Sequence, residues 1–144
     1  MQIKPLNSDL AVAAQISPED ISTIAAEGFR TVINNRPDGE SPDQPGGDRI
    51  AQVSQELGLN YAYQPVISGG FTLDDVEEFG RLLDQAEKPV LAYCRSGTRC
   101  TMLWALSQAG KLETREIIES AAKAGYDLSG MRGQIDSLAQ QRKG

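Results

Sequence analysis

The stretch PVLAYCRSGTRCTMLW, residues 89–104, changes from apolar to polar and back to apolar within a short span. The continuous apolar run at 89–93 is typical of a central strand that is buried on both faces. The apolar residues over 101–110 favour a buried helix that follows this strand. A strand joined to a helix by the loop 94–99 is the repeating unit of an α/β domain, so this stretch predicts a parallel sheet.

The rest of the chain alternates in the same way between strand-like and helical patterns. Strands are expected over 10–14, 29–35, 60–67 and 89–93, and helices over 17–28, 50–57, 72–86, 101–110, 115–125 and 130–142. Two helix starts carry the spacing of a capping box, Ser17 with Asp20 and Thr72 with Asp75. The sequence therefore predicts a single domain over residues 1–144, a three-layer α/β fold whose mostly parallel central sheet is flanked by helices.

The composition excludes several classes of function. The net charge is −6, which argues against nucleic acid or anionic membranes as partners. No apolar run approaches the roughly 18 residues that span a bilayer. The N-terminus, MQIKPLNSDLAVAAQ, lacks the apolar stretch of a signal peptide, so a cytoplasmic location is expected. No metal-ligand cluster or nucleotide-binding glycine pattern is visible, and neither a metal nor a cofactor is expected.

The loop 94–99, CRSGTR, has the residues of an anion-binding cradle. It exposes successive backbone N–H groups at the start of a helix, where the helix dipole adds partial positive charge. Gly97 lets the backbone approach a bound oxyanion closely, and the planar guanidinium of Arg99 suits phosphate or sulfur oxyanions. The candidate substrate-binding residues are Arg95, Ser96, Gly97 and Thr98, together with Arg36 from the turn-rich loop 36–47.

Cys94 opens this loop and is the candidate nucleophile, with Arg99 as its catalytic partner. N–H donors, a helix terminus and a nearby arginine all lower the pKa of a thiol, so Cys94 is expected to be largely thiolate near neutral pH. The chain has no histidine, and a thiolate is a nucleophile that needs no histidine base. Cys100 falls in the first turn of the next helix and is interpreted as packing, with a resolving or redox function as the alternative.

Three segments, GFRTVINNRPDGE, PVISGGFT and PVLAYCRSGTRC, follow one another along the chain. Together they resemble the phosphatase-like domain that occurs in bacteria alone or fused to beta-lactamase-like hydrolases. The resemblance extends over residues 8–130. It implies a fold like that of the dual-specificity and tyrosine phosphatases, with Cys94 as nucleophile and the loop 94–99 as oxyanion cradle.

The length of this loop leaves two reactions of the Cys94 thiolate open. Tyrosine-phosphatase-type enzymes carry His-Cys, five residues and then Arg. Here Tyr93 precedes Cys94, and four residues separate Cys94 from Arg99. The shorter loop is similar to that of rhodanese sulfurtransferases, and its smaller ring of N–H donors suits a persulfide or thiosulfate sulfur better than a full phosphoryl group.

Phosphate-ester cleavage also benefits from an acid that protonates the leaving oxygen. Phosphatases of this fold usually carry an aspartate on the loop that here reads SGGF, residues 68–71. Asp38 is a candidate acid, and an Asp38–Arg36 pair that stabilises a proline turn is the alternative interpretation. Asp74 and Asp75 fit the capping of a helix better than catalysis.

Sulfur transfer needs no acid of this kind, because a thiolate attacks a sulfane sulfur and an acceptor thiol or cyanide removes the resulting persulfide. Sulfur transfer through a Cys94 persulfide is therefore slightly favoured. Phosphomonoester hydrolysis through a Cys94 phosphocysteine is the alternative, and a non-catalytic anion-binding module is the third hypothesis. The expected partners are a small anionic substrate and a protein or small thiol that accepts the transferred group.

Overall fold

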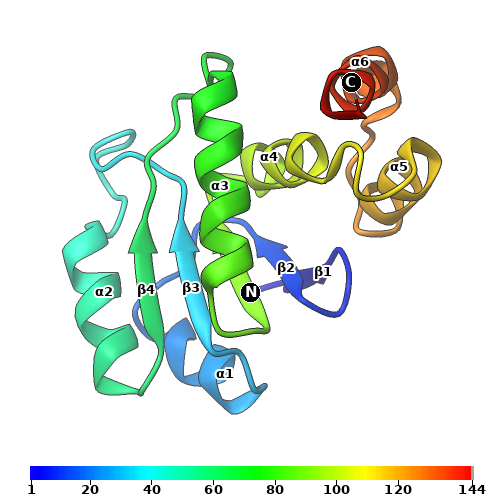
Figure 1. Ribbon diagram of the computed structural model, residues 1–144. Coiled ribbons are helices and arrows are strands. Elements are labelled where there is room, and N and C mark those ends of the chain that lie inside the picture. Colours follow the sequence, from blue (N-terminus) through cyan, green and yellow to red (C-terminus); the bar gives the residue numbers. More distant parts are fainter. Residues whose placement is uncertain (144) are drawn as a thin grey trace.

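The computed structural model describes residues 1–143 and contains one five-stranded sheet of order β1-β2-β5-β3-β4 (Figure 1). The strands in that order are β1 (Lys4–Pro5), β2 (Leu10–Ala13), β5 (Val90–Tyr93), β3 (Thr31–Asn34) and β4 (Asn60–Tyr63). The last four are parallel, whereas β1 pairs with β2 antiparallel. The predicted α/β fold with a mostly parallel sheet is therefore confirmed.

Helices cover both faces of the sheet, as expected for parallel strands joined by crossover helices. One face packs against α1 (Asp20–Ala26) and α2 (Gly47–Glu56), and the other against α3 (Leu73–Gln85) and α4 (Thr98–Gln108). The C-terminal helices α5 (Thr114–Lys123) and α6 (Arg132–Lys143), with the short 3₁₀ helix η1 (Ser129–Met131) between them, pack on α4 away from the sheet (Figure 1).

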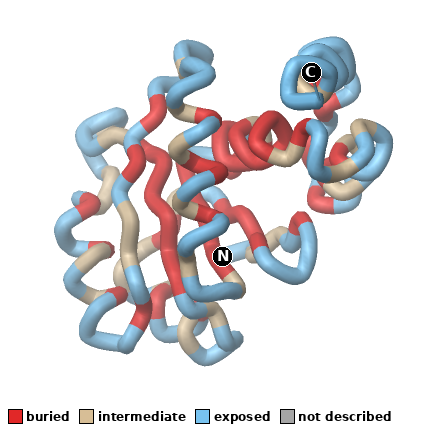
Figure 2. The backbone as a smooth tube through the Cα atoms, in the orientation of Figure 1, coloured by how far each residue is buried: buried red, intermediate tan, exposed pale blue. Residues whose placement is uncertain are grey.

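Successive residues of β5 point to opposite faces of the sheet, which gives the domain two cores. Leu91 and Tyr93 belong to the core beneath α1 and α2, and Ala92 and Cys94 belong to the core beneath α3 and α4. Figure 2 shows β3 and most of α4 as buried segments. This alternation places the side chain of Cys94 on the α4 side of the sheet and that of Tyr93 on the other.

Several boundaries differ by a few residues from the sequence-based expectation, and one strand was not expected. Helix α4 begins at Thr98 rather than Thr101, because Gly97 turns the chain directly into the helix with a φ of 90°. Strand β4 ends at Tyr63 rather than at residue 67, although the N–H groups of Gln64 and Val66 still donate to the carbonyls of Asn34 and Asn35. The antiparallel strand β1 was not predicted, since two residues are too few to show an alternating pattern.

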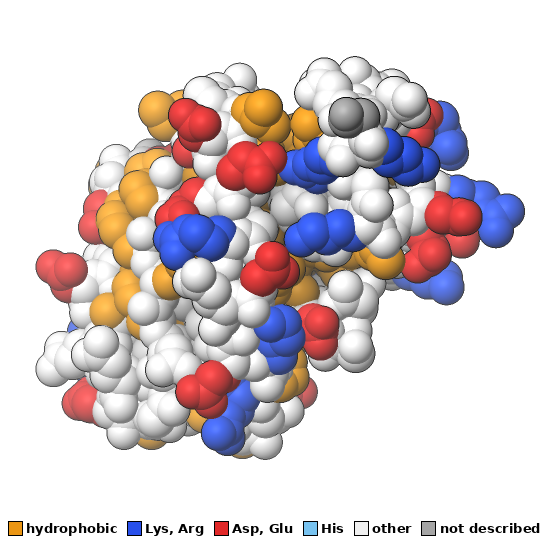
Figure 3. All heavy atoms as spheres, in the orientation of Figure 1, with side chains coloured by type: hydrophobic (Ala, Val, Ile, Leu, Met, Phe, Trp, Pro, Cys, Tyr) orange, Lys and Arg blue, Asp and Glu red, His pale blue; other side chains and the backbone are white. Residues whose placement is uncertain are grey.

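The surface in view carries both signs of charge in alternation. Figure 3 shows Lys and Arg side chains interspersed with Asp and Glu over α3 and the C-terminal helices. Arg81 pairs with Glu78 on α3, and Arg142 of α6 pairs with Glu77 of α3. None of the helices within residues 1–143 has both the length and the apolar character that crossing a membrane requires.

Candidate active site

The loop between β5 and α4 lies at the carboxyl ends of the parallel strands, where α/β sheets bind their ligands. Because β5 lies between β2 and β3, the segments that follow these two strands flank the loop. The backbone N–H of Cys94 donates to the carbonyl of Ala13 at 3.4 Å, and that of Asn35 donates to the carbonyl of Tyr93 at 2.9 Å. The ends of the three strands thus hold the start of the loop in place.

Three successive carbonyl groups of the loop, those of residues 95–97, have donors outside it. Three contacts fix them: Gln15 N–H to Arg95 O at 3.2 Å, Tyr126 Oη to Ser96 O at 2.9 Å, and Thr101 Oγ1 to Gly97 O at 2.8 Å. In a planar trans peptide the C=O and N–H groups point in opposite directions. Carbonyls held outward therefore turn the N–H groups of the loop inward, which is the arrangement of an anion-binding nest.

The thiol of Cys94 lies at the centre of these N–H groups. The amide of Gly97 donates to Cys94 Sγ at 3.1 Å. The pKa of Cys94 is lowered to about 5, mainly by the side chain of Cys100 and then by the amides of Cys100, Ser96 and Gly97, while burial opposes the shift. The expected thiolate is therefore what this geometry favours at neutral pH.

Cys100 contributes more to this site than the sequence indicated. It is fully buried at the first turn of α4, as the packing interpretation expects. Its thiol also lowers the pKa of Cys94. Burial, and then the neighbouring Cys94, raise the pKa of Cys100 well above the ordinary value. Cys100 therefore remains a neutral thiol beside the Cys94 thiolate. Both cysteines are free.

Arg99 is held by Glu40 from the loop that follows β3. Arg99 Nη1 donates to Glu40 Oε2 and Nη2 donates to Glu40 Oε1, each at 2.9 Å. Arg99 Nη1 also donates to the carbonyl of Val66 at 2.9 Å. The arginine that the sequence assigned to the anion is thus 8% exposed at its side chain and engaged by a carboxylate.

Arg36 binds the same carboxylate. Its Nε donates to Glu40 Oε1 at 2.9 Å, and its Nη1 donates to Gln15 Oε1 at 3.0 Å. The Arg99 guanidinium, followed by that of Arg36, holds the pKa of Glu40 below its usual range although burial acts in the other direction. Glu40 is consequently an ionised bridge between two arginines. A function of Arg36 in substrate binding stays a prediction.

Asp38 lies apart from this bridge. Its Oδ1 accepts from the backbone N–H of Gly47 at 2.8 Å at the start of α2, and its own N–H donates to the Tyr63 hydroxyl at 3.0 Å. The alternative Arg36–Asp38 pair is not among the ion pairs of residues 1–143, where Arg36 bonds Glu40 instead. Its function as an acid stays a prediction.

The predicted capping box at Thr72 is present. Asp75 N–H donates to Thr72 Oγ1 at 3.3 Å, and Thr72 N–H donates to Asp75 Oδ2 at 2.8 Å. The Asp75 carboxylate is thus engaged at the start of α3, as the capping interpretation of this residue expects.

The other predicted binding residues of the loop differ in exposure. Arg95, Ser96 and Thr98 are exposed, whereas Gly97 is buried against Tyr126. Ser96 Oγ donates to Thr98 Oγ1 at 2.9 Å, so the two hydroxyl groups brace each other at the helix start. Their contact with a substrate stays a prediction.

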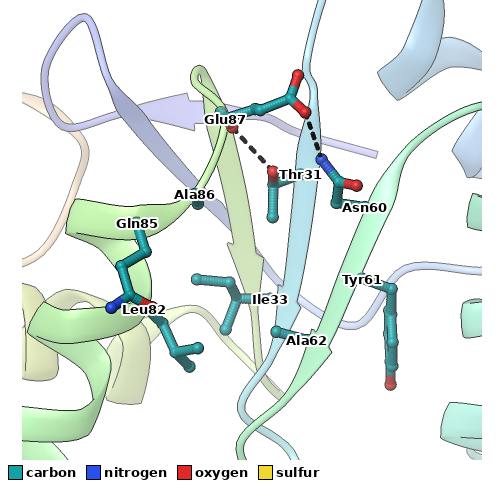
Figure 4. A pocket seen from close by; sticks show the side chains of 9 residues that line it. All are labelled: Thr31, Ile33, Asn60, Tyr61, Ala62, Leu82, Gln85, Ala86 and Glu87. Carbon is teal, nitrogen blue, oxygen red and sulfur yellow. Dashed lines mark hydrogen bonds between the residues drawn. The ribbon is translucent and has the colours of Figure 1, made fainter.

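A separate hollow lies at the other end of the sheet. Figure 4 shows its lining, which includes Thr31, Asn60 and Glu87, with Glu87 hydrogen-bonded to both of the others. Thr31 and Asn60 begin their strands, whereas Cys94 follows the carboxyl end of β5. This hollow is therefore distinct from the loop 94–99. No group of three or more His, Cys, Asp or Glu residues within 1–143 is placed to hold a metal ion.

Three residues of the site were not predicted from the sequence: Gln15, Glu40 and Tyr126. Glu40 had a local signal, because it follows Arg36 by four residues within RPDGE. Gln15 and Tyr126 had none, since each meets the loop only after the chain has folded.

Residues 2–111 match the family described as "Beta-lactamase hydrolase-like protein, phosphatase-like domain". Beta-lactamase hydrolase-like proteins of Xylella fastidiosa and Agrobacterium fabrum are 38% and 34% identical to the chain over 130 residues. These alignments cover 89% of the chain but 30% of each relative, so the chain spans less than a third of their length.

Solved structures of similar fold include proteins described as phosphatases. A candidate phosphatase from Neisseria meningitidis is 39% identical, with a TM-score of 0.86 over 96% of this chain and 99% of that one. Tk-PTP in its active form has a TM-score of 0.74 at 17% identity, over 97% of both chains. PTPMT1 has a TM-score of 0.75 at 14% identity, over 99% of this chain and 96% of that one. At these low identities the last two show the fold alone, and that fold is the phosphatase-like one expected from the sequence.

Proposed function

Because the chain belongs to the phosphatase-like domain family of beta-lactamase hydrolase-like proteins, as its motifs indicated, we propose that it is an enzyme that forms a covalent intermediate on Cys94. The substrate is a small anion, which the N–H groups of the loop 94–99 bind as the thiolate attacks. A small thiol or a protein thiol accepts the group where the reaction is a transfer.

One observation carries this proposal. The sulfur of Cys94 accepts a hydrogen bond from the Gly97 amide at 3.1 Å, within a loop in which the carbonyls of residues 95–97 accept from residues outside it. The pKa of the thiol is lowered to about 5. A thiolate beside preorganised N–H donors is a nucleophile and an oxyanion site in one loop. A non-catalytic anion-binding module predicts a thiol of ordinary pKa and is less well supported.

Phosphomonoester hydrolysis is the first candidate reaction, and the comparisons favour it over the sulfur transfer that the sequence slightly favoured. The Cys94 thiolate attacks phosphorus, an S–P bond forms, and the P–O bond to the alcohol breaks. Water then attacks the phosphocysteine, which releases inorganic phosphate and restores the thiolate. The loop amides stabilise the charge on the equatorial oxygens in both steps.

Sulfur transfer is the second candidate, and the state of the nearby carboxylates favours it. Gln64 to Thr72 contains no acidic residue, Glu40 is kept ionised between two arginines, and Asp38 accepts from the Gly47 amide. The first step of phosphate-ester cleavage is helped by a proton for the leaving alcohol, and none of these groups is positioned as its donor. Attack on a sulfane sulfur expels a weakly basic leaving group instead.

In that reaction the thiolate attacks the outer sulfur of thiosulfate. The S–S bond of thiosulfate breaks, sulfite leaves with the bonding pair, and a Cys94 persulfide forms. Cyanide or an acceptor thiol then takes the outer sulfur, as thiocyanate or as a new persulfide, and the Cys94 thiolate is restored. No oxidant or reductant beyond these two reactants is required.

Two parallel reactions of the purified protein decide between the candidates. One sample receives an aryl phosphate and is followed by phenolate release. The other receives thiosulfate and is weighed intact by mass spectrometry, with Cys94→Ser as the control in both. Phenolate release that needs Cys94, without a gain of one sulfur atom, establishes phosphatase activity. A one-sulfur gain on Cys94 without phenolate release establishes sulfur transfer and contradicts the first candidate. Full activity of Cys94→Ser in either arm would refute Cys94 as the nucleophile.

A further inference from the structure

Tyr126 reaches the catalytic loop from a part of the chain that lies beyond the family match over residues 2–111. It follows α5 and precedes η1, and its side chain returns to the start of α4. The Tyr126 hydroxyl donates to the carbonyl oxygen of Ser96 at 2.9 Å. The two residues are 30 positions apart in sequence, so this bond is formed by the tertiary fold.

The opposite end of the same peptide group contacts the nucleophile. The peptide that joins Ser96 to Gly97 carries its C=O on Ser96 and its N–H on Gly97, and these two groups point in opposite directions in a trans peptide. The C=O accepts from Tyr126, and the N–H donates to Cys94 Sγ at 3.1 Å. One peptide plane thus connects the phenol hydroxyl to the thiolate.

We propose that Tyr126 is a positioning residue for the reaction of Cys94: its hydroxyl fixes the Ser96–Gly97 peptide so that the Gly97 amide stays directed at the sulfur. This proposal rests on the proposed function only in taking Cys94 as the reacting group. A donor on the carbonyl also polarises the peptide, which strengthens its N–H as a donor at the other end. Tyr126 therefore acts on the nucleophile without touching the substrate.

The surroundings of Tyr126 fit this function. A Cβ at Gly97 would overlap the Tyr126 hydroxyl, so the loop and the phenol are in direct contact and only glycine leaves room for both. Lys4 Nζ lies over the Tyr126 ring, 4.8 Å from its centre, and this cation–π contact helps to hold the ring. Burial, and then the charge at Cys94, raise the pKa of the Tyr126 hydroxyl, so it keeps its proton and remains a donor.

The contribution of Tyr126 is separable from the other groups around the sulfur. Cys100 acts on Cys94 through its side chain and its amide, and the Arg99 guanidinium interacts with the Cys94 charge from α4. The Tyr126→Phe variant removes the hydroxyl, retains the ring beneath Lys4, and leaves both of those groups in place. Its effect on Cys94 therefore passes through the Ser96–Gly97 peptide.

The test is a titration of the Cys94 thiol, read as the rate of alkylation by iodoacetamide against pH. We expect Tyr126→Phe to raise the apparent pKa of Cys94 by about 0.5 to 1 pH unit, which lowers the thiolate fraction near the midpoint several-fold. Tyr63→Phe is the matched control, because the Tyr63 hydroxyl also bonds a backbone group, the amide of Asp38, away from the sulfur. The control is expected to titrate like the unchanged protein.

A second variant keeps the shape of the phenol and is expected to change the apparent pKa of Cys94 in the opposite direction. Replacement of Tyr126 by 3-fluorotyrosine makes the hydroxyl a stronger donor and is expected to lower the apparent pKa of Cys94. A merely structural function of Tyr126 predicts lower thermal stability of Tyr126→Phe with no change in the Cys94 titration, and that result would overturn the proposal. Because the readout is alkylation rather than turnover, it remains decisive even if neither proposed reaction is observed.

Discussion

The Glu40 carboxylate accepts hydrogen bonds from both terminal nitrogens of Arg99, with Nη1–Oε2 and Nη2–Oε1 distances of 2.9 Å. It thereby joins the loop after β3 to the first turn of α4. The paired guanidinium also holds the carbonyl of Val66. In this arrangement Arg99 holds the loop 94–99 in place from its helix side. The N–H groups of the loop are the donors that face Cys94, and the carboxylate compensates the charge of two arginines.

Loss of the Glu40 charge is expected to destabilise the protein. Glu40→Gln leaves the buried Arg36 and Arg99 without their anion, and we expect a decrease of about 1 to 3 kcal/mol in the free energy of unfolding by urea. Because the pKa of Glu40 is lowered in the fold, this contribution is present above the unfolded pKa of about 4.3 and is lost as the pH falls through the lower folded value.

The control for this variant is Glu78→Gln, which removes an ion pair with Arg81 on the exposed side of α3. Exposed pairs of this kind contribute little to stability, so no measurable change is expected. Equal effects of the two substitutions at neutral pH would show that Glu40 does not hold the arginines in solution.

The thiolate of Cys94 makes stability depend on pH in a window with few other titrating groups. The thiol titrates at about 5 in the fold and near about 8.5 in an unfolded chain. The unfolded state therefore binds more protons between these values, so stability rises with pH across the window and is lost as the pH falls through about 5.

No histidine titrates between these pH values, because the chain has none. We expect the free energy of unfolding to rise with pH more steeply in the unchanged protein than in Cys94→Ala. Urea titrations at several pH values measure both slopes. Parallel curves would contradict a lowered pKa at Cys94.

Cys100 is expected to lower the pKa of Cys94. Its side chain is the largest influence that lowers the pKa of Cys94, so Cys100→Ala should raise that pKa and slow alkylation of Cys94 at mildly acidic pH. Cys100→Ser keeps a donor at the same position and should change the titration less. An unaltered titration in Cys100→Ala would leave the loop amides as the main cause of the shift.

Gly97 is expected to tolerate no side chain. Its φ is 90°, and a Cβ there would overlap the Tyr126 hydroxyl. Gly97→Ala should therefore lower the free energy of unfolding by about 2 to 4 kcal/mol, from the backbone strain and the steric overlap together. Gly125→Ala is the control, because Gly125 has a φ of 99° and no heavy atom within 4 Å of a Cβ. If both variants lose equal stability, the contact with Tyr126 is not formed.

Much of the fold follows from local patterns, and much of the site does not. The apolar run at 89–93 and the alternation of strands and helices predicted the parallel sheet, which the structure confirms. Thr72 and Asp75 predicted a capping box that is also present. These features depend on residues that are neighbours in sequence, where propensity and capping chemistry act directly.

The site depends on pairs that only the tertiary fold creates. Arg99 meets Glu40 across 59 positions, and Ser96 meets Tyr126 across 30. From the loop sequence alone, Arg99 is a free fork for an anion, because its partner lies on another segment. The predicted start of α4 was also wrong. Gly97 adopts a left-handed backbone conformation, so the helix begins at Thr98 and Cys100 lies beside Cys94.

The burial of Cys94 limits which molecules can reach its sulfur, a restriction that is independent of the low pKa of the thiol. Only 1% of the residue is exposed, so the sulfur is covered by its neighbours rather than lying on the surface. A molecule can react there only if its electrophilic atom projects on a slender group. Small alkylating agents are therefore expected to outpace bulky aromatic disulfides, although the latter are stronger electrophiles toward an exposed thiolate. Molecular width, as much as chemical class, then selects what this cysteine modifies.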